Sequence, residues 1–221
     1  MGYHLILASA SPRRREILSQ VGIAYSVFPS KFNEREITQK EPENYVKELS
    51  LAKAKEVYQR LVTGENNKKT GNKVVFENGE EDFCLEPFVV LGADTVVAHR
   101  GIILNKPSDR EDAAGMRRKL QGDVHEVYTG VALLYRNHNG KENIQNFAVK
   151  TEVCFYPMTM QEIENYLDCK EYTDKAGAYA IQGRMAAYIR EIRGDYYNVV
   201  GLPVSAIVQE LKKLKIEALR C

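Results

Sequence analysis

The chain of 221 residues lacks the motifs that announce several common enzyme classes. It has no GxxxxGK[ST] loop, which excludes a P-loop nucleotide hydrolase. It also has no GxGxxG turn after its first predicted strand and no HExxH zinc motif. Its four histidines are scattered along the chain, so they give no argument for a Ser-His-Asp triad.

Unusual cysteine spacing, excess charge and long apolar runs are missing as well. The four cysteines form neither a CxxC pair nor a zinc-like spacing, which favours reduced thiols in a cytosolic protein. Lys and Arg total 31 against 30 Asp and Glu, so there is no bulk basic surface for nucleic acid or membrane. No apolar run approaches the roughly 20 residues of a membrane span, and the N-terminus lacks the apolar core of a signal peptide. We expect a cytoplasmic protein with neither a nucleic-acid nor a membrane partner.

What is present is an alternation of short apolar runs and helical periodicities, without internal repeats. Strands are predicted at 5–8, 24–28, 88–91, 124–134 and 144–155, with a hairpin over 96–104. Helices are predicted from residue 12 and over 42–61, 109–120, 159–167 and 204–218. This order predicts an α/β fold with a mixed sheet.

The composition, 44% hydrophobic and 28% charged, is that of an ordinary globular core. We therefore expect one domain over residues 1–221. Residues 62–86 break the pattern of strands and helices, with glycines and an Asn78-Gly79 pair. This segment is predicted to be an insertion, either a loop or a hairpin.

Residues 7–17, Leu-Ala-Ser-Ala-Ser-Pro-Arg-Arg-Arg-Glu-Ile, join the first predicted strand to the first helix. Ser11 suits an N-cap and Pro12 suits the first helical position. Three consecutive arginines follow, where the helix macrodipole disfavours positive charge. A bound anion, most plausibly phosphate, would account for them. The alternative is a capped helix whose arginines are solvated.

Asp94 is the strongest candidate for a catalytic acid. It follows the apolar run 88–91, so we expect it at the carboxyl end of a buried strand, where open α/β sheets bind ligands. Gly92 and Ala93 beside it would let a ligand approach closely. A carboxylate here can bind Mg²⁺ or Mn²⁺ or orient a water molecule. Glu34 is a second carboxylate that such a site can use, although the sequence alone favours a solvated loop acid.

Basic and small residues elsewhere extend this hypothesis. Lys53, on the second predicted helix, and Lys106, before Pro107, can neutralise a polyphosphate. Small residues over 174–183 let a ligand or another backbone approach closely. Gln182 in that segment carries both a donor and an acceptor, which suits the edge of a nucleobase. A second glycine-bearing segment, 194–203, fits either ligand contact or tight packing.

Taken together, these motifs resemble the Maf family over nearly the whole chain. The motifs, in family order, are Ser9-Ala-Ser-Pro-Arg-Arg, Gly92-Ala-Asp-Thr-Val, Lys106-Pro, Tyr128-Thr-Gly-Val, Asp174-Lys-Ala-Gly, Ile181-Gln-Gly and Asn198-Val-Val-Gly-Leu-Pro. Maf proteins are nucleoside triphosphate pyrophosphatases that use a divalent metal. The resemblance implies an elongated mixed sheet flanked by helices, with a central cleft between two lobes.

The resemblance also implies roles for individual residues. Asp94 would be the catalytic acid that activates water, and Glu34 and Asp94 would bind Mg²⁺ or Mn²⁺. The residues expected to bind the triphosphate are Ser9, Arg13, Arg14, Lys53 and Lys106, with Asp195 as a further candidate.

Arg13, Thr95 and Gln182 match the branch that acts on dTTP and UTP. The branch acting on 7-methyl-GTP carries Gln in place of Thr95 and Glu in place of Gln182. The family further suggests a homodimer. Two alternatives stay open: a nucleotide-binding regulator of cell division or septum formation, and a house-cleaning pyrophosphatase for modified nucleotides such as 7-methyl-GTP.

Overall fold

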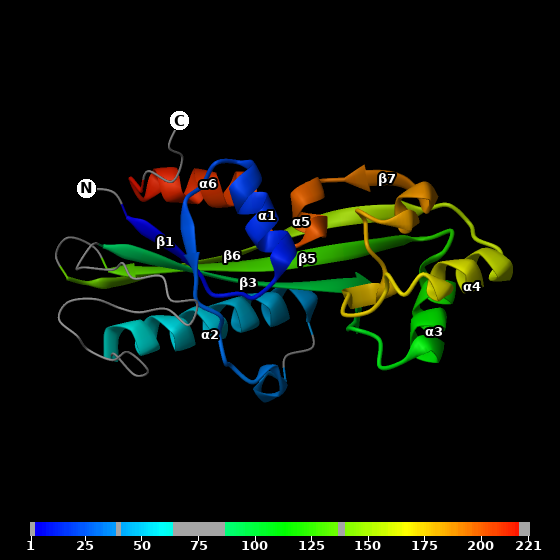
Figure 1. The fold of residues 1–221 in the computed structure, drawn as a ribbon, viewed down its shortest axis with the longest axis horizontal. Helices are drawn as coiled ribbons and strands as arrows, with labels where there is room; N and C mark the ends of the chain where they lie inside the picture. Colours follow the sequence, from blue (N-terminus) through cyan, green and yellow to red (C-terminus); the bar gives the residue numbers. More distant parts are fainter. Residues whose placement is uncertain (1–2, 39–40, 64–86, 137–139, 217–221) are drawn as a thin grey trace.

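The computed structural model describes residues 3–38, 41–63, 87–136 and 140–216. A mixed seven-stranded sheet runs along the described part of the molecule, which is elongated (Figure 1). The strands are β1 (His4–Leu7), β2 (Tyr25–Val27), β3 (Phe88–His99), β4 (Ile102–Leu104), β5 (Val124–Arg136), β6 (Glu142–Phe155) and β7 (Ile189–Arg193). Their order is β2-β1-β3-β5-β6-β7, with β4 paired to β3. The predicted α/β class with a mixed sheet is confirmed.

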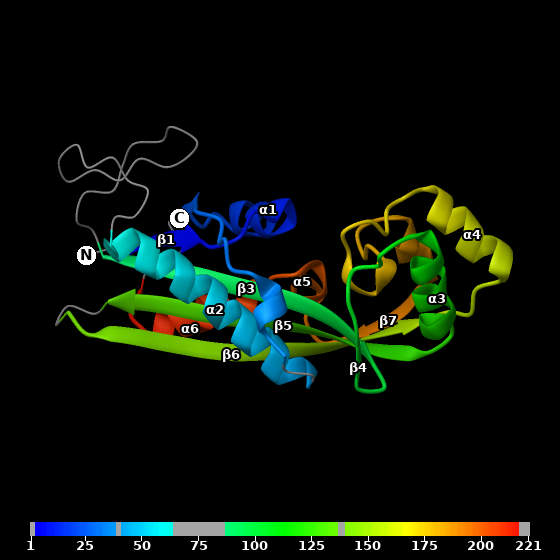
Figure 2. The same cartoon turned by 90° about the horizontal axis from the view of Figure 1, so that it is seen from below.

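Strand direction changes in the middle of this sheet. β1 pairs in parallel with both β2 and β3, whereas β3, β5, β6 and β7 follow one another antiparallel. Helix α2 (Pro42–Thr63) crosses one face (Figure 2). The other face carries α1 (Pro12–Gln20), α5 (Tyr196–Val200) and α6 (Val204–Lys213). α3 (Arg110–Leu120) and α4 (Met160–Asp168) lie together at one end of the molecule.

Glycine lets α2 lie directly on the sheet. A Cβ on Gly92 would overlap the carbonyl oxygen of Ser50, and a Cβ on Gly130 would overlap that of Val46. The neighbouring strands β3 and β5 contribute these two glycines, which leave room for the helix backbone. The expectation that Gly92 makes room for a ligand is therefore wrong, because α2 fills that space.

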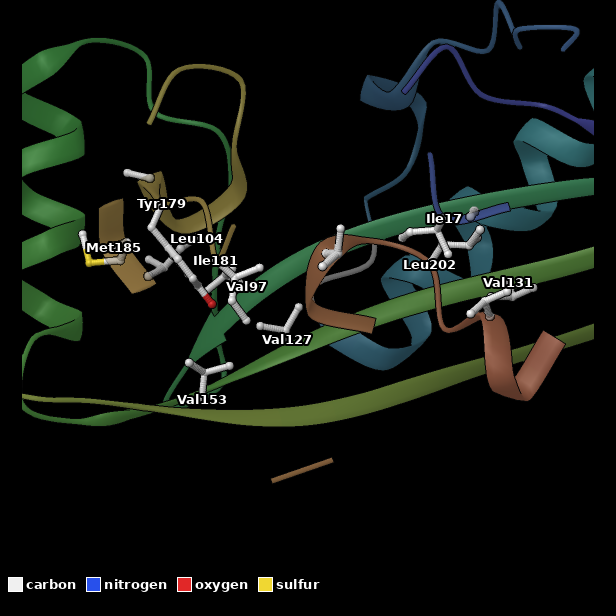
Figure 3. Packing of buried hydrophobic residues seen from close by; sticks show 14 of the residues in the cluster. Ile17, Val97, Leu104, Val127, Val131, Val153, Tyr179, Ile181, Met185 and Leu202 are labelled. Atoms are coloured by element: carbon white, nitrogen blue, oxygen red, sulfur yellow. The ribbon is translucent and has the colours of Figure 1, made fainter. Parts of the chain in front are cut away.

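Side chains of β3 alternate between two cores, as the period of a strand requires. Val90 packs under α2 with Ile6, Val57 and Leu134. Val89 and Leu91 face the opposite core. Figure 3 shows that core gathering Ile17, Val131 and Leu202 in one place, and Val97, Val127 and Tyr179 in another.

One predicted strand boundary is wrong in a way that matters for the site. The strand predicted at 88–91 continues to His99, because β5 pairs with it from Val89 to Ala98. Asp94 therefore lies inside β3 rather than at its carboxyl end. The first arm of the predicted hairpin 96–104 is the end of β3, while its turn at Arg100-Gly101 and its second arm are confirmed.

The C-terminal boundaries also differ from expectation. The last helix ends at Lys213, because Lys215 adopts a φ of 57° and the N–H of Ile216 donates to the carbonyl of Leu211. The sequence analysis did not predict β7 and α5. Each has five residues, which is too short to show a recognisable periodic pattern.

The proposed insertion at 62–86 lies almost wholly outside the described residues, and its first two residues end α2. Within the described ranges, no helix combines the length and apolar character needed to cross a membrane.

Candidate active site

A cavity of about 1260 Å³ opens beside the end of β1. Nine of the residues predicted for the site line it: Ser9, Arg13, Arg14, Glu34, Lys53, Asp94, Thr95, Lys106 and Gln182. They come from six separate stretches of the sequence, which the fold brings to one place. Their individual roles remain predictions, as does a division of the molecule into two lobes.

The parallel pairing of β1 with β3 creates this meeting point. β1 ends at Leu7, opposite Leu91, and the chain then turns through Ser9 into α1. β3 continues past that level and brings Asp94 alongside the turn. The sheet edge predicted to bind a ligand is thus the carboxyl end of β1, and Asp94 lies next to it on the neighbouring strand.

Strand periodicity sends Asp94 and Thr95 to opposite faces of the sheet. Asp94 shares the α2 face with Gly92 and contacts Lys53 of α2. Thr95 points to the other face, where it bonds Arg14 and lies near Gly201. Both residues line the cavity, so the cavity reaches both faces around the end of β1.

Lys53 joins the two predicted metal ligands. Its Nζ lies 2.5 Å from Asp94 Oδ1 and 2.7 Å from Glu34 Oε1. The side chains of Lys53 and Asp94 are each 12% exposed, whereas that of Glu34 is 53% exposed. Partial burial alone would raise the pKa of Glu34, but the hydrogen bond and charge of Lys53, helped by Lys106 and Arg14, lower it overall.

This arrangement fits a hard divalent cation. Two carboxylates already converge on one positive charge, and Mg²⁺ is usually bound by one or two carboxylates together with substrate phosphates. The described residues contain no group of three or more His, Cys, Asp or Glu side chains able to hold a metal. The remaining ligands would have to be phosphate oxygens and water.

The three consecutive arginines have three different environments. Arg15 is exposed and Arg13 is half-buried at the cavity wall. Arg14 is only 9% exposed, and burial lowers its pKa, with Asp94 opposing and Arg13 adding to the effect. Its guanidinium donates to the Gly201 carbonyl at 2.9 Å, to Ser9 Oγ at 2.9 Å and to Thr95 Oγ1 at 3.3 Å.

The predicted start of α1 is confirmed in position, although Ser11 does not cap it with its side chain. Ser11 is the residue before the helix and Pro12 the first within it. No hydrogen bond from the helix reaches the Ser11 hydroxyl; instead the Ser11 N–H donates to Ser9 Oγ at 3.3 Å. The turn is therefore closed locally by Ser9, which also bonds Arg14.

The glycine-bearing segments serve packing as well as the cavity. Gly177 has a φ of 66°, and a Cβ there would press on Val97 at 2.9 Å, so it permits close approach of the backbone to β3. Gln182, five residues later, is exposed at the cavity wall. Lys106 is likewise exposed there.

Asp195, the further candidate for the phosphate and metal shell, does not line the cavity, and that role stays a prediction. Its Oδ1 accepts the N–H groups of Tyr197 and Asn198, and its Oδ2 accepts the hydroxyl of Ser205. Asp195 is the N-cap of α5.

Other residues of the wall were missed. Tyr45, Glu171 and Lys175 line the cavity without having been singled out. Burial, followed by the charge of Arg13, lowers the pKa of Lys175. Its position in the Asp174-Lys-Ala-Gly motif was the one signal that could have identified it.

An α/β sheet that brings two carboxylates and several lysines and arginines around one cavity is suited to binding a polyphosphate. The chain belongs to the Maf family: the family model described as "Maf-like protein" matches residues 4–214.

Similar proteins cover almost the whole chain. A protein of Agathobacter rectalis named dTTP/UTP pyrophosphatase is 44% identical over 96% of this chain and 98% of its own length. Proteins of the same name from Lachnoclostridium phytofermentans and Bacillus thuringiensis are 40% and 39% identical over 99% and 96% of this chain. The aligned regions span 98% and 96% of the lengths of these two relatives.

Proposed function

We propose that this protein hydrolyses dTTP and UTP to the nucleoside monophosphate and pyrophosphate. The observation that carries the proposal is the convergence of Asp94, Glu34 and Lys53 beside the basic start of α1. The names of the relatives support these two substrates.

The triphosphate binds through charge and through the helix start. Arg13 and Lys106 are free enough to move onto phosphate oxygens, since Arg13 is half-buried and Lys106 exposed. Arg14 adds a fixed positive charge with N–H groups to spare. The unpaired N–H groups at the start of α1 favour an anion in the same place.

The chemical step is attack of water on the α-phosphorus. Asp94 orients the water molecule and accepts its proton, the bond between water oxygen and phosphorus forms, and the bond from phosphorus to the α–β bridging oxygen breaks. Pyrophosphate leaves with that oxygen, and its charge is balanced by Lys106 and Arg13. Mg²⁺ or Mn²⁺, held by Glu34 and Asp94, would neutralise charge on the phosphate oxygens.

Base selection falls to Gln182, assisted by Arg13 and Thr95. The Gln182 amide carries an acceptor and a donor, which complement N3–H and O4 of uracil or thymine. Its exposure at the cavity wall leaves the amide available to a base.

A screen of pyrophosphate release tests the proposal. Purified protein is incubated with natural and modified nucleoside triphosphates and Mg²⁺ or Mn²⁺, and dTTP and UTP are expected to react fastest. No release from any triphosphate would favour a nucleotide-binding regulator. A clear preference for 7-methyl-GTP would favour the house-cleaning alternative.

A homodimer is a further part of the proposal. In the described residues no strand pairs with the outer edge of β6 between Glu142 and Thr151, and unpaired edges bind other strands. Antiparallel pairing of two copies about Asn146 would set Glu142 opposite Lys150. Sedimentation velocity decides between monomer and dimer, and a monomer at all concentrations would refute this part.

A further inference from the structure

Arg14 is held in the cavity wall by neutral groups. Its three described hydrogen bonds go to the Gly201 carbonyl and to the hydroxyls of Ser9 and Thr95. A guanidinium has five N–H donors, so two remain for a phosphate. Because none of these partners carries a negative charge, they fix the direction of the guanidinium without neutralising it.

A chain of hydroxyl groups continues from Arg14 into the sheet. Thr95 Oγ1 lies 2.9 Å from Thr129 Oγ1, and Thr129 donates to the carbonyl of Asn198 at 3.0 Å. Thr129 has one hydroxyl proton, which it donates to the Asn198 carbonyl. Thr95 therefore donates to Thr129 at 2.9 Å in preference to the more distant Gly201 carbonyl at 3.4 Å. The lone pairs of Thr95 are then left to accept from Arg14.

The series of hydrogen bonds that starts at Arg14 ends at Asn198 and holds α5 in place. The Asn198 amide donates to the Val127 carbonyl and to Thr151 Oγ1, both at 3.0 Å. Thr151 also donates to the carbonyl of Asp195 at 3.1 Å and accepts its N–H. Residue Gly201, whose carbonyl receives Arg14 Nε, is the C-cap of the same helix. Two contacts thus orient the Arg14 guanidinium: one with the Thr95 hydroxyl, and one with the Gly201 carbonyl at the end of α5.

We propose that Thr129 is a positioning residue for nucleotide binding, acting on Arg14 through Thr95 and α5. It is fully buried, so it contacts no substrate itself. The hydrogen bonds of this buried network restrict the geometry of its members, although Asn198 Oδ1 has no partner among the described residues. A small displacement of a group that binds the reacting phosphates costs far more than its size suggests. The inference rests on the proposed function for the identity of the ligand.

The test is the affinity for α,β-methylene-UTP with Mg²⁺, measured by calorimetry. Thr129→Val keeps the side-chain shape and removes the hydroxyl, and it should weaken binding about tenfold, the equivalent of one hydrogen bond to a charged group. Thr129→Ser restores the hydroxyl and should stay within about twofold of wild type. Ser50→Ala is the matched control, since it removes another fully buried hydroxyl, bonded within α2 to Lys47, and should not change affinity.

A double-mutant cycle separates positioning from general damage. Thr129→Val should have no further effect on affinity in an Arg14→Gln background, because its effect passes through Arg14. Unchanged affinity in folded Thr129→Val, or full additivity in the double variant, would overturn the inference. Thr129→Cys, with its weakly bonding thiol, replaces the valine variant if that variant does not fold. Since the analogue is not turned over, failure of wild type to release pyrophosphate would count against the proposed function alone.

Discussion

Lys53 Nζ lies 2.5 Å from Asp94 Oδ1, and this contact fixes α2 to β3 at the point where the cavity opens. Gly92, two residues before Asp94, brings the α2 backbone close enough for Lys53 to reach the carboxylate. Glu34, at the start of the 3-10 helix Glu34–Glu36, completes the group by its contact with Lys53. The ammonium thus stands between the two carboxylates that we propose as metal ligands.

Asp94→Asn should lower kcat by about 10²- to 10⁴-fold, the usual contribution of a general base. The amide cannot accept the proton of water, yet it has nearly the same shape, so affinity for α,β-methylene-UTP should stay close to that of wild type. Asp174→Asn is the control, because Asp174 lines the same cavity and is exposed. A wild-type rate in Asp94→Asn would remove Asp94 from the mechanism.

Lys53→Met should bind Mn²⁺ more tightly while turning over more slowly. Loss of the ammonium frees two carboxylates for the cation, and the gain should be about tenfold, equal to about 1.4 kcal/mol of charge interaction. Electron paramagnetic resonance of Mn²⁺ measures the affinity without nucleotide. Unchanged or weaker Mn²⁺ binding would mean that Glu34 and Asp94 do not form the metal site. Lys55→Met, on the exposed side of the same helix, provides the comparison.

Gln182→Glu should reduce the preference for UTP over GTP by about tenfold, because a carboxylate cannot donate to O4 of the pyrimidine and is placed to accept from a purine N1–H. Ratios of kcat/KM over a panel of nucleotides measure the change. The exposed Arg184→Gln, two residues away, is a control for the local loop. If the UTP/GTP ratio stays at its wild-type value, Gln182 does not read the base.

Nine residues of the cavity wall could be predicted from the sequence, whereas the contacts between them could not. Asp94 was recognised from the apolar run before it, although the end of its strand was misplaced because pairing with β5 cannot be seen in a local pattern. Arg14 and Gly201 are 187 residues apart and bond directly. Asp195, the further candidate, caps α5 by accepting the N–H groups of Tyr197 and Asn198.

The fold could be predicted where a periodic pattern of apolar residues extends over a long segment. The spacing of Thr159 and Glu162 is that of the capping box that the structure shows. The helix predicted over 42–61 from its apolar period is α2, which continues to Thr63. β7 pairs with β6 across a register shift between Cys154 and Phe155, and such a five-residue strand has no independent signal. Tertiary pairing, rather than local preference, decides these short elements.

His125 should make the protein less stable in acid. Burial, followed by the charges of Arg117 and His99 and opposed by Asp123, lowers its pKa to about 3. The imidazole is 2.8 Å from the Tyr179 hydroxyl and packs on Phe155. An unfolded histidine titrates near pH 6.5, so between about pH 6.5 and pH 3 the unfolded chain binds one proton more than the native state. The free energy of unfolding therefore falls as the pH is lowered through that window.

His125→Phe should flatten this dependence, although it loses the bond to Tyr179 and is less stable at pH 7. Urea unfolding of both proteins at pH 7, 6 and 5 gives the difference in slope, which should approach about 1.4 kcal/mol per pH unit at the acid end. Tyr179→Phe removes the same hydrogen bond and keeps the imidazole, so its slope should match wild type. Parallel slopes for wild type and His125→Phe would show that the imidazole is not held neutral in the native protein. Tyr179 also lines the cavity. Protonation of His125 would therefore disturb a side chain of the cavity wall through its hydrogen bond to Tyr179.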